Sequence, residues 1–218
     1  MPKFNIAIDG PSGVGKSTIA NLLADEYHMI HLDTGAMYRC VAYYLLKKNV
    51  NVDDQKELME ALDDIDISFQ EDQVFLNGEN VSKEIRMNEI SMAASKFSAL
   101  DPVRKKLVSL QQQIAKNKGY ILDGRDICTV VLPDAEVKIY MDASSKARAQ
   151  RRYQEYVSKG IDADYETIFQ DIVARDYQDS HRENSPLRVA DDAQVIDTSD
   201  MTIDEVVDEI KKMIDETV

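Results

Sequence analysis

The segment GPSGVGKST, residues 10–18, constrains the fold of this chain more than any other part of its sequence. It satisfies the pattern G-x-x-x-x-G-K-[ST] through Gly10, Gly15, Lys16 and Ser17. A strand-like run, KFNIAID, precedes the segment, and apolar residues recur at helical spacing from Ile19 to Tyr27. The glycines therefore lie at a turn from a buried strand to a helix, where free backbone N–H groups and the helix dipole attract anions.

This turn predicts a site for the phosphates of a nucleotide. We expect Lys16 to place a positive charge at the terminal phosphates, and the Ser17 hydroxyl to be a ligand for Mg²⁺. The residues predicted to surround the phosphates are Gly10, Pro11, Ser12, Gly13, Val14, Gly15, Lys16, Ser17 and Thr18.

Length and composition indicate a globular chain of one domain, with room for an insertion. The 218 residues are 44% hydrophobic and 30% charged, and no apolar run approaches the roughly 20 residues that span a bilayer. The first residues, MPKFNIAIDG, run directly into the phosphate loop, so we expect no targeting segment. Cys40 and Cys128 lie far apart and suggest neither a disulfide framework nor a metal site. We therefore expect a cytoplasmic protein with no membrane partner.

The charge balance argues against nucleic acid as a partner. The formal net charge is −14, from 26 basic and 40 acidic residues, whereas a nucleic-acid surface needs a broad positive footprint. Arginines nevertheless gather in the C-terminal third of the chain, which suits a local pocket for a nucleotide. They are Arg148, Arg151, Arg152, Arg175, Arg182 and Arg188.

The hydrophobic pattern predicts an α/β fold with a parallel sheet flanked by helices. Strand-like runs lie at about 4–9, 120–123, 137–141 and 194–197, each with a helical pattern beside it. The segment 66–81 differs, because Asn77-Gly78 between strand-like residues is typical of a tight β turn. We expect a small antiparallel insertion there.

Two further helices are well marked at their ends and are expected to be scaffold. One begins at Asp101-Pro102 and ends before Gly119, and the last begins at a capping box formed by Thr202 and Glu205.

The arginine-rich third contains two predicted helices. In 142–160, Arg148, Arg151 and Arg152 project from one helix face, either as a solvated basic face or toward a ligand. In 164–183, the apolar stripe of Ile168 and Ile172 continues at the same spacing as charged side chains. These are Arg175, Asp179 and Arg182. A polar cavity is favoured over local pairing within the helix, because charges on an inward face need partners.

Two loops complete the candidate site. LDTGAMYR, 32–39, and LDGRD, 122–126, follow strand-like runs, and parallel sheets bind ligands beyond the carboxyl ends of their strands. We therefore expect four polar side chains near the phosphate loop, namely Thr34, Arg39, Arg125 and Asp126.

The ordered combination of these segments resembles bacterial cytidylate kinases over essentially the whole chain. The segments are GPSGVGKST, LDTGAMYR, AASKFSALDPVR, LDGRD with TVVLPDA after it, and RDYQDSHR. The resemblance implies a P-loop nucleoside-monophosphate-kinase fold with a small antiparallel β insertion and a helical lid. It also implies Mg²⁺-dependent transfer of a phosphoryl group from ATP to CMP or dCMP, which gives ADP and CDP or dCDP.

The resemblance assigns roles to residues that match its motifs. Arg39, Arg125 and Arg182 are expected at the CMP phosphate. Ser95, Arg104 and Asp126 are expected at cytosine, and Arg175 with Asp179 at the ribose. Thr34 stands where many members have Ser and keeps the hydroxyl. Arg148, Arg151 and Arg152 are expected in a lid over ATP.

The implied organisation is a single kinase domain, 1–218. Its core is expected over about 1–62, 91–147 and 184–218, the CMP-binding insertion over about 63–90, and the lid over about 148–183. A monomer is the default expectation for the oligomeric state.

Phosphoryl transfer needs alignment and charge neutralisation more than a general base. The residues predicted to be catalytic are Lys16, Arg148, Arg152 and Arg182. The three histidines, His28, His31 and His181, show no spacing that suggests a catalytic triad.

Other functions share the phosphate loop. A GTP-binding switch should carry an Asn-Lys-x-Asp guanine reader, and the nearest match, NKGY at 117–120, lacks the Asp. Uridylate, adenylate and shikimate-type kinases remain the nearer enzyme alternatives.

Overall fold

The structure is a computed structural model that describes residues 2–70 and 73–218. The chain divides into two compact units, of which the first comprises Met1–Asp33 and Gln112–Val218, and the second comprises Thr34–Gln111. The expected insertion lies within the second unit, and the expected lid lies within the first. The assignment of those two segments to CMP binding and to lid closure stays a prediction.

A five-stranded parallel sheet organises the first unit, as the hydrophobic pattern predicts. Its order is β2-β6-β1-β7-β8, so that β1 occupies the centre. The strands are β1 (Ile6–Asp9), β2 (Ile30–Asp33), β6 (Tyr120–Gly124), β7 (Val137–Asp142) and β8 (Gln194–Asp197). Because all five strands are parallel, their carboxyl ends lie at one edge of the sheet, which is where such sheets place ligands.

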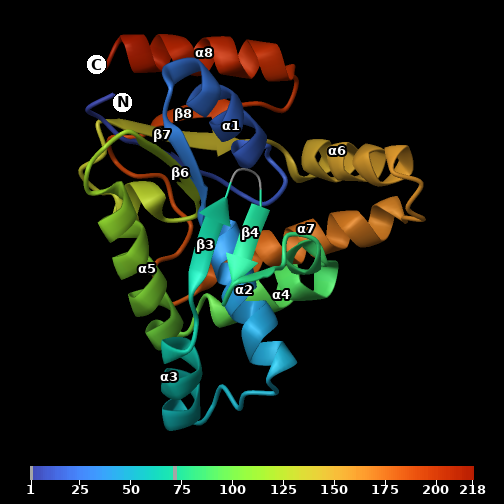
Figure 1. Ribbon diagram of the computed structural model, residues 1–218. Helices are drawn as coiled ribbons and strands as arrows, with labels where there is room; N and C mark the ends of the chain where they lie inside the picture. The colour runs from blue at the N-terminus through green and yellow to red at the C-terminus, as the bar shows by residue number, and fades with distance from the viewer. Residues whose placement is uncertain (1, 71–72) are drawn as a thin grey trace. The chain divides into compact units, whose positions relative to one another are not determined.

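Helices α1 (Lys16–Tyr27) and α8 (Ile203–Asp215) pack on this sheet through one hydrophobic core (Figure 1). Ile6, Ile8 and Ile139 from the sheet are fully buried, as are Leu23 of α1 and Ile210 of α8. Each such side chain contributes about 1.5–3 kcal/mol of burial free energy. The core therefore fixes the start of α1, and with it the phosphate loop.

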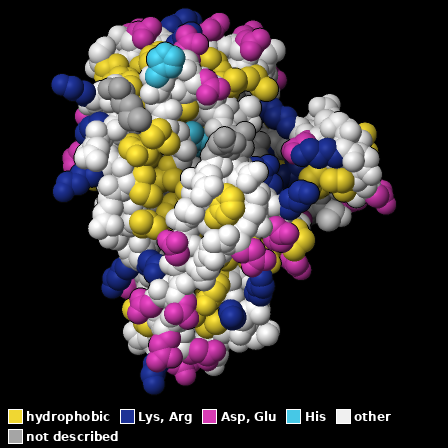
Figure 2. Space-filling model, viewed as in Figure 1, with side chains coloured by type: hydrophobic (Ala, Val, Ile, Leu, Met, Phe, Trp, Pro, Cys, Tyr) yellow, Lys and Arg dark blue, Asp and Glu magenta, His cyan; other side chains and the backbone are white. Residues whose placement is uncertain are grey.

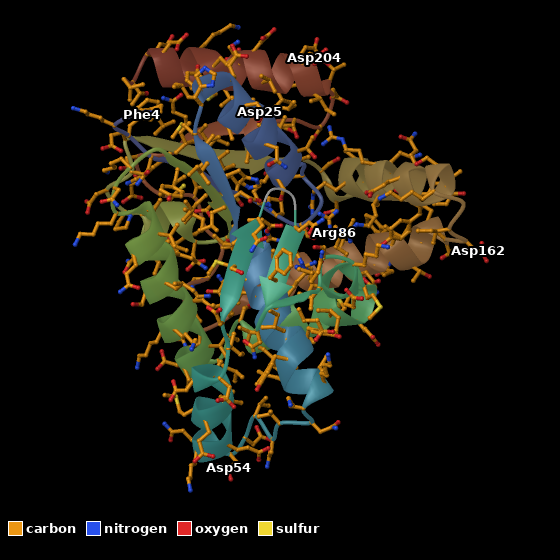
Figure 3. The ribbon with its side chains drawn as sticks, in the orientation of Figure 1. Phe4, Asp25, Asp54, Arg86, Asp162 and Asp204 are labelled. Carbon is orange, nitrogen blue, oxygen red and sulfur yellow. The ribbon has the colours of Figure 1, made fainter. Side chains whose placement is uncertain are left out.

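Helices α6 (Ser145–Ser158) and α7 (Tyr165–His181) form a pair with a small core of their own. Ala149, Ile168 and Ile172 are buried between them, and the rings of Tyr153 and Tyr165 meet edge to face at 6.2 Å. Figure 3 shows Asp162 in the connection between the two helices, at the far end of the pair.

The second unit contains helices and a small antiparallel sheet. Its elements are α2 (Thr34–Lys47), α3 (Gln55–Asp63), β3 (Ile67–Gln70), β4 (Gln73–Leu76), β5 (Glu79–Asn80), η1 (Glu84–Arg86), α4 (Asn88–Phe97) and most of α5 (Asp101–Ala115). The predicted turn is confirmed, because Asn77 and Gly78 have φ angles of 51° and 79° between paired Leu76 and Glu79.

Capping explains several helix boundaries. The Thr202 hydroxyl accepts from the Glu205 backbone N–H at 3.3 Å, and the Glu205 carboxylate accepts from the Thr202 N–H at 2.8 Å, as the predicted capping box requires. Figure 3 shows Asp54 at the start of α3 and Asp204 in the first turn of α8. Carboxylates at these positions interact favourably with the positive end of the helix dipole.

Acidic residues outnumber basic ones by 40 to 26, which gives the net charge of −14. In Figure 2, Asp and Glu side chains lie over α8 in the first unit and, in the second unit, around α3. Within residues 2–70 and 73–218, no helix combines the length and the apolar character that crossing a membrane requires.

Candidate active site

The phosphate loop joins β1 to α1 and depends on its glycines. Gly13 and Gly15 have φ angles of 77° and 100°, which favour glycine over other residues. A Cβ atom at Gly10 would lie 2.1 Å from the carbonyl oxygen of Met141 in β7, so a side chain cannot be accommodated there. The loop therefore lies directly against the sheet, at the carboxyl ends of β1 and β7.

Lys16 is buried beneath this loop. Its Nζ donates to the carbonyl oxygens of Gly10 and Pro11, both at 2.9 Å, and the residue is 6% exposed. Burial, together with the positive charge of Arg125, lowers the pKa of Lys16 to about 7. Because its own loop carbonyls hold the amine at the base of the loop, the position suits contact with phosphate oxygens.

Ser17 and Asp123 bring a hydroxyl and a carboxylate together at the start of α1. Ser17 Oγ donates to Asp123 Oδ2 at 2.9 Å. Burial raises the pKa of Asp123, but its hydrogen bond to His31 and the charges of His31 and Lys16 outweigh that effect and hold the pKa below the usual value. A hydroxyl and an ionised carboxylate are oxygen donors of the kind that Mg²⁺ prefers, so these residues fit the predicted cation.

Three arginines of α6 were predicted to belong to a lid, and their contacts differ. Arg148 is 3% exposed, and it donates to the Ser12 carbonyl at 3.0 Å and to both carboxylate oxygens of Asp176 at 3.1 and 2.6 Å. Arg152 NH2 donates to Ser12 Oγ at 3.3 Å. Arg151 instead hydrogen-bonds to the hydroxyl and carbonyl of Thr198, after β8. The α6 helix is therefore tied to the phosphate loop through Ser12.

Arg125 and Asp126 follow β6, and each pairs with a residue from the predicted charged stripe. Arg125 Nε donates to Asp179 Oδ2 at 2.8 Å, and Arg182 NH2 lies 3.6 Å from Asp126 Oδ1. Asp179 is 3% exposed at the end of α7, where the stripe that begins with Ile168 and Ile172 continues into the interior. Asp179 and Arg182 thus pair with residues that follow β6, and not only with neighbours along their own helix.

Asp9 holds the turn that carries Asp126, a function that no sequence motif indicates. The Asp9 carboxylate accepts from the backbone N–H groups of Ile127 and Cys128, both at 2.8 Å. These residues begin η2 (Ile127–Val131), a π-helical turn, and Asp126 directly precedes it. Burial raises the pKa of Asp9 to about 6. The one available signal is its place at the end of β1, next to Gly10.

Four predicted site residues lie in the second unit. Thr34 is buried at the first position of α2, and Arg39 is half-buried on the same helix. Ser95 of α4 and Arg104 of α5 are connected through Ser98, which donates to the Ser95 carbonyl at 2.7 Å and accepts from Arg104 at 3.3 Å through its own carbonyl. The Arg104 guanidinium also lies 5.8 Å from the centre of the Tyr38 ring.

A cavity of about 500 Å³ adjoins the phosphate loop in the first unit. Its apolar lining includes Ile19, Met141, Met201, Ile203 and Val206, and its polar lining includes Arg151, Arg152 and Glu155. The last helix, with its capping box, was expected to be scaffold alone, whereas Ile203 and Val206 at its start line the same cavity as the phosphate loop. The position of this segment after a parallel strand, β8, is the signal that could have indicated it.

Comparison with known proteins agrees with this geometry. The family model described as cytidylate kinase matches residues 6–216. Cytidylate kinase of Caldicellulosiruptor bescii is 48% identical over 98% of this chain and 96% of that protein. Cytidylate kinase of Thermosipho melanesiensis is 49% identical over 97% of this chain and 96% of that protein. A solved shikimate kinase from Bacteroides thetaiotaomicron shares the fold, with a TM-score of 0.53 and 8% identity over 97% of this chain and 98% of that one.

Proposed function

The chain belongs to the cytidylate kinase family, and we propose that the groups around its phosphate loop carry out that family's reaction in the roles given below. The activity is ATP-dependent phosphorylation of CMP and dCMP. The observation that carries the assignment of roles is the position of Lys16, buried beneath the loop at the carboxyl edge of the parallel sheet.

The donor nucleotide belongs at the phosphate loop. Its β- and γ-phosphates accept from the backbone N–H groups of residues 10–18, and Lys16 supplies a positive charge. Ser17, next to Asp123, would hold Mg²⁺, which would neutralise charge on the phosphates. The 500 Å³ cavity is of a size and apolar character that suit the base of the donor.

The acceptor, CMP or dCMP, belongs at the arginines and carboxylates that follow β6 and end α7. We assign the CMP phosphate to Arg125 and Arg182, the cytosine amino group to Asp126, and the ribose to Arg175 and Asp179. From the second unit, we assign CMP contacts to Thr34, Arg39, Ser95 and Arg104. These assignments rest on the family motifs, and the pairing of Arg125 with Asp179 and of Arg182 with Asp126 supports them.

The transfer itself needs few protein groups. An oxygen of the CMP phosphate is already an adequate nucleophile, so it attacks the γ-phosphorus without a general base while ADP departs. Lys16, Arg152 and Arg182 stabilise the charge that spreads over the transferred group. Arg148 contributes by donating a hydrogen bond to the Ser12 carbonyl, which orients the phosphate loop. Closure of α6 and α7 excludes water that would otherwise accept the phosphoryl group.

A panel of acceptors tests this proposal. Purified protein with ATP and Mg²⁺ is given CMP, dCMP, UMP, AMP or shikimate, and ADP release is measured against a sample without acceptor. We expect CMP and dCMP to stimulate release strongly and the others weakly, and EDTA to abolish it. Stimulation by UMP or AMP above that by CMP would contradict the acceptor assignment. We also propose that the chain acts as a monomer, which sedimentation of the purified protein tests.

A further inference from the structure

His31 connects α1 to the phosphate loop through a chain of hydrogen bonds. Its Nδ1 lies 2.7 Å from Asn21 Oδ1, and its Nε2 lies 2.7 Å from Asp123 Oδ1. The other carboxylate oxygen, Asp123 Oδ2, accepts from Ser17 Oγ at 2.9 Å. Four side chains from α1, β2 and β6 are thus joined within the first unit.

Both ring nitrogens of His31 face oxygen acceptors. A carboxylate oxygen only accepts hydrogen bonds, so Nε2 donates to Asp123, and this contact favours a positive charge on the ring. Burial of the ring opposes this charge, but the hydrogen bond and the charge of Asp123 raise the pKa of His31 above its ordinary value. The ring is therefore held at both ends and has one orientation.

The order of the groups distinguishes this arrangement from a nucleophilic triad. In a triad the imidazole lies between the carboxylate and the hydroxyl and takes the proton of the hydroxyl. Here the carboxylate of Asp123 lies between His31 and Ser17, so His31 does not receive the proton of Ser17. Because Ser17 donates its hydrogen to Asp123, both lone pairs of its oxygen are left for other partners.

Asp123 has a second cation within electrostatic reach. Its charge acts on Lys16 and raises the pKa of that amine against the effect of burial. A carboxylate that is free to rotate can turn toward Lys16, which would remove the acceptor from Ser17 and neutralise a charge intended for phosphates. The hydrogen bond from His31 opposes such rotation, because it fixes one of the two oxygens.

We propose that His31 is a positioning residue, which holds one oxygen of Asp123 so that the other stays directed at the Ser17 hydroxyl. Asn21 completes the arrangement by fixing the far side of the ring. The proposal rests on the proposed function, since the orientation of Ser17 matters where that residue serves a nucleotide bound with Mg²⁺.

Two substitutions of His31 separate positioning from packing. His31→Leu fills the site without a donor, whereas the amide of His31→Gln can still donate to Asp123. His28→Gln, at an exposed position directly after α1, is the control. We measure kcat, the KM for CMP, the thermal unfolding midpoint, and the ADP affinity by calorimetry with Mg²⁺ and with EDTA.

We expect His31→Leu to lower kcat about 10- to 100-fold and to reduce by a similar factor the gain in ADP affinity that Mg²⁺ provides, as for other residues that orient a metal ligand. The KM for CMP should change little, and His31→Gln should recover most of both losses. If His31→Leu stays within about twofold of the wild type in both quantities, or His31→Gln is as defective as His31→Leu, the proposal is wrong.

Failure of the proposed function is recognised separately. If the wild type does not phosphorylate CMP, the acceptor assignment fails, while the effect of Mg²⁺ on ADP affinity still tests His31. If the unfolding midpoint shows that His31→Leu does not fold, Asn21→Ala provides the same readouts, because it removes only the outer partner of the ring. A loss of the Mg²⁺ effect in Asn21→Ala supports the proposal, and an unchanged effect overturns it.

Discussion

Arg125 donates through Nε to the Asp179 carboxylate at 2.8 Å, although 54 positions separate the two residues in the sequence. The side chains are 18% and 4% exposed, so neither charge is well solvated. Burial raises the pKa of Asp179, but the charges of Arg125 and Arg175 hold it below the usual value. The pair thus joins the loop after β6 to the end of α7 and keeps Asp179 ionised.

Asp179→Ala should reduce stability and activity together. Removing one member of a buried ion pair leaves the other charge uncompensated, which costs about 3–5 kcal/mol. If Asp179 also accepts from the ribose 2′-hydroxyl, kcat/KM should fall more for CMP than for dCMP, which lacks that hydroxyl. Kinetics with CMP and dCMP, and chemical denaturation of the wild type and of Asp179→Ala, measure these effects. An equal fractional loss for CMP and dCMP would remove the ribose assignment and leave only the pairing with Arg125.

Lys16→Ala should abolish turnover and leave CMP binding largely intact. The amine lies beneath the phosphate loop, which we assign to the donor nucleotide. Calorimetry with CMP alone, and a steady-state assay with ATP and CMP, test the separation of the two sites. Lys116→Ala, at an exposed position, is the control. A loss of CMP affinity comparable to the loss of rate would show that the donor and acceptor sites are misassigned.

Arg148→Lys should weaken the connection between α6 and the phosphate loop. Lysine keeps the charge but cannot donate at once to Ser12 and to both oxygens of Asp176, because it lacks the planar fork of arginine. We expect a loss of stability of about 1–3 kcal/mol and a higher KM for ATP. Arg188→Lys, on an exposed arginine, controls for the change of residue type. Unchanged stability, with a large fall in kcat, would instead support direct contact between Arg148 and the transferred phosphate.

Asp9 should make stability depend on pH between about 4 and 6. Its pKa is raised from 3.8 to about 6 in the folded chain, so over that range the folded state binds more protons than the unfolded state. Stability therefore falls as pH rises, and above pH 6 the full cost of the buried charge remains, on the order of 3 kcal/mol.

The side chain of Asp9→Asn carries no charge in the folded or the unfolded state, so this variant should lack the contribution of Asp9 to the pH dependence of the unfolding free energy. Denaturation of both proteins at pH 4 and pH 7 gives the difference in unfolding free energy, in which other titrating groups cancel. The wild type should lose about 2.5 kcal/mol relative to Asp9→Asn between those two pH values, because the unfolded carboxyl is already partly ionised at pH 4. Asp25→Asn, at an exposed site on α1 that Figure 3 labels, should show no such change. A constant difference across the range would mean that Asp9 stays charged in the folded chain.

Local sequence patterns predict much of this fold correctly. The predicted parallel strands are present, the turn at Asn77 and Gly78 has the left-handed geometry that its residues favour, and the capping box of Thr202 and Glu205 is formed. Each of these features depends on residues close together in sequence, because strand alternation, turn conformation and helix capping are local.

The partners within the site could not be predicted, because they come from distant segments. Arg151 looks equivalent to Arg148 and Arg152 by helical spacing, yet it hydrogen-bonds to Thr198 after β8. His31 shows no motif, and its partners Asn21 and Asp123 are brought to it by the pairing of β2 with β6 and by the position of α1. Spacing gives the face on which a side chain lies, whereas its partner depends on how the elements pack.

Asp126 should decide the choice between cytosine and uracil. Cytosine presents an amino donor where uracil presents a carbonyl acceptor, so a carboxylate at that edge attracts one base and repels the other. An unpaired acceptor in a buried site costs about 1–3 kcal/mol, which is roughly ten- to a hundredfold against UMP. Asp126 is buried, and its backbone carbonyl accepts from Val130 and Val131, so its position is well fixed.

The nearby arginine provides the competing explanation. Arg182 NH2 lies 3.6 Å from Asp126 Oδ1, so the carboxylate could serve only to orient that guanidinium. Removing the carboxylate would then lower kcat/KM equally for CMP and UMP. We expect instead that Asp126→Ala lowers kcat/KM for CMP far more than for UMP. Asp126→Asn should narrow the gap further with little change in volume, because its amide can donate to the uracil carbonyl. Kinetics with CMP and UMP on both variants, with exposed Asp134→Asn as control, decide between the two roles. A CMP-to-UMP ratio that stays at the wild-type value would assign Asp126 to Arg182 alone, whatever the change in absolute rate.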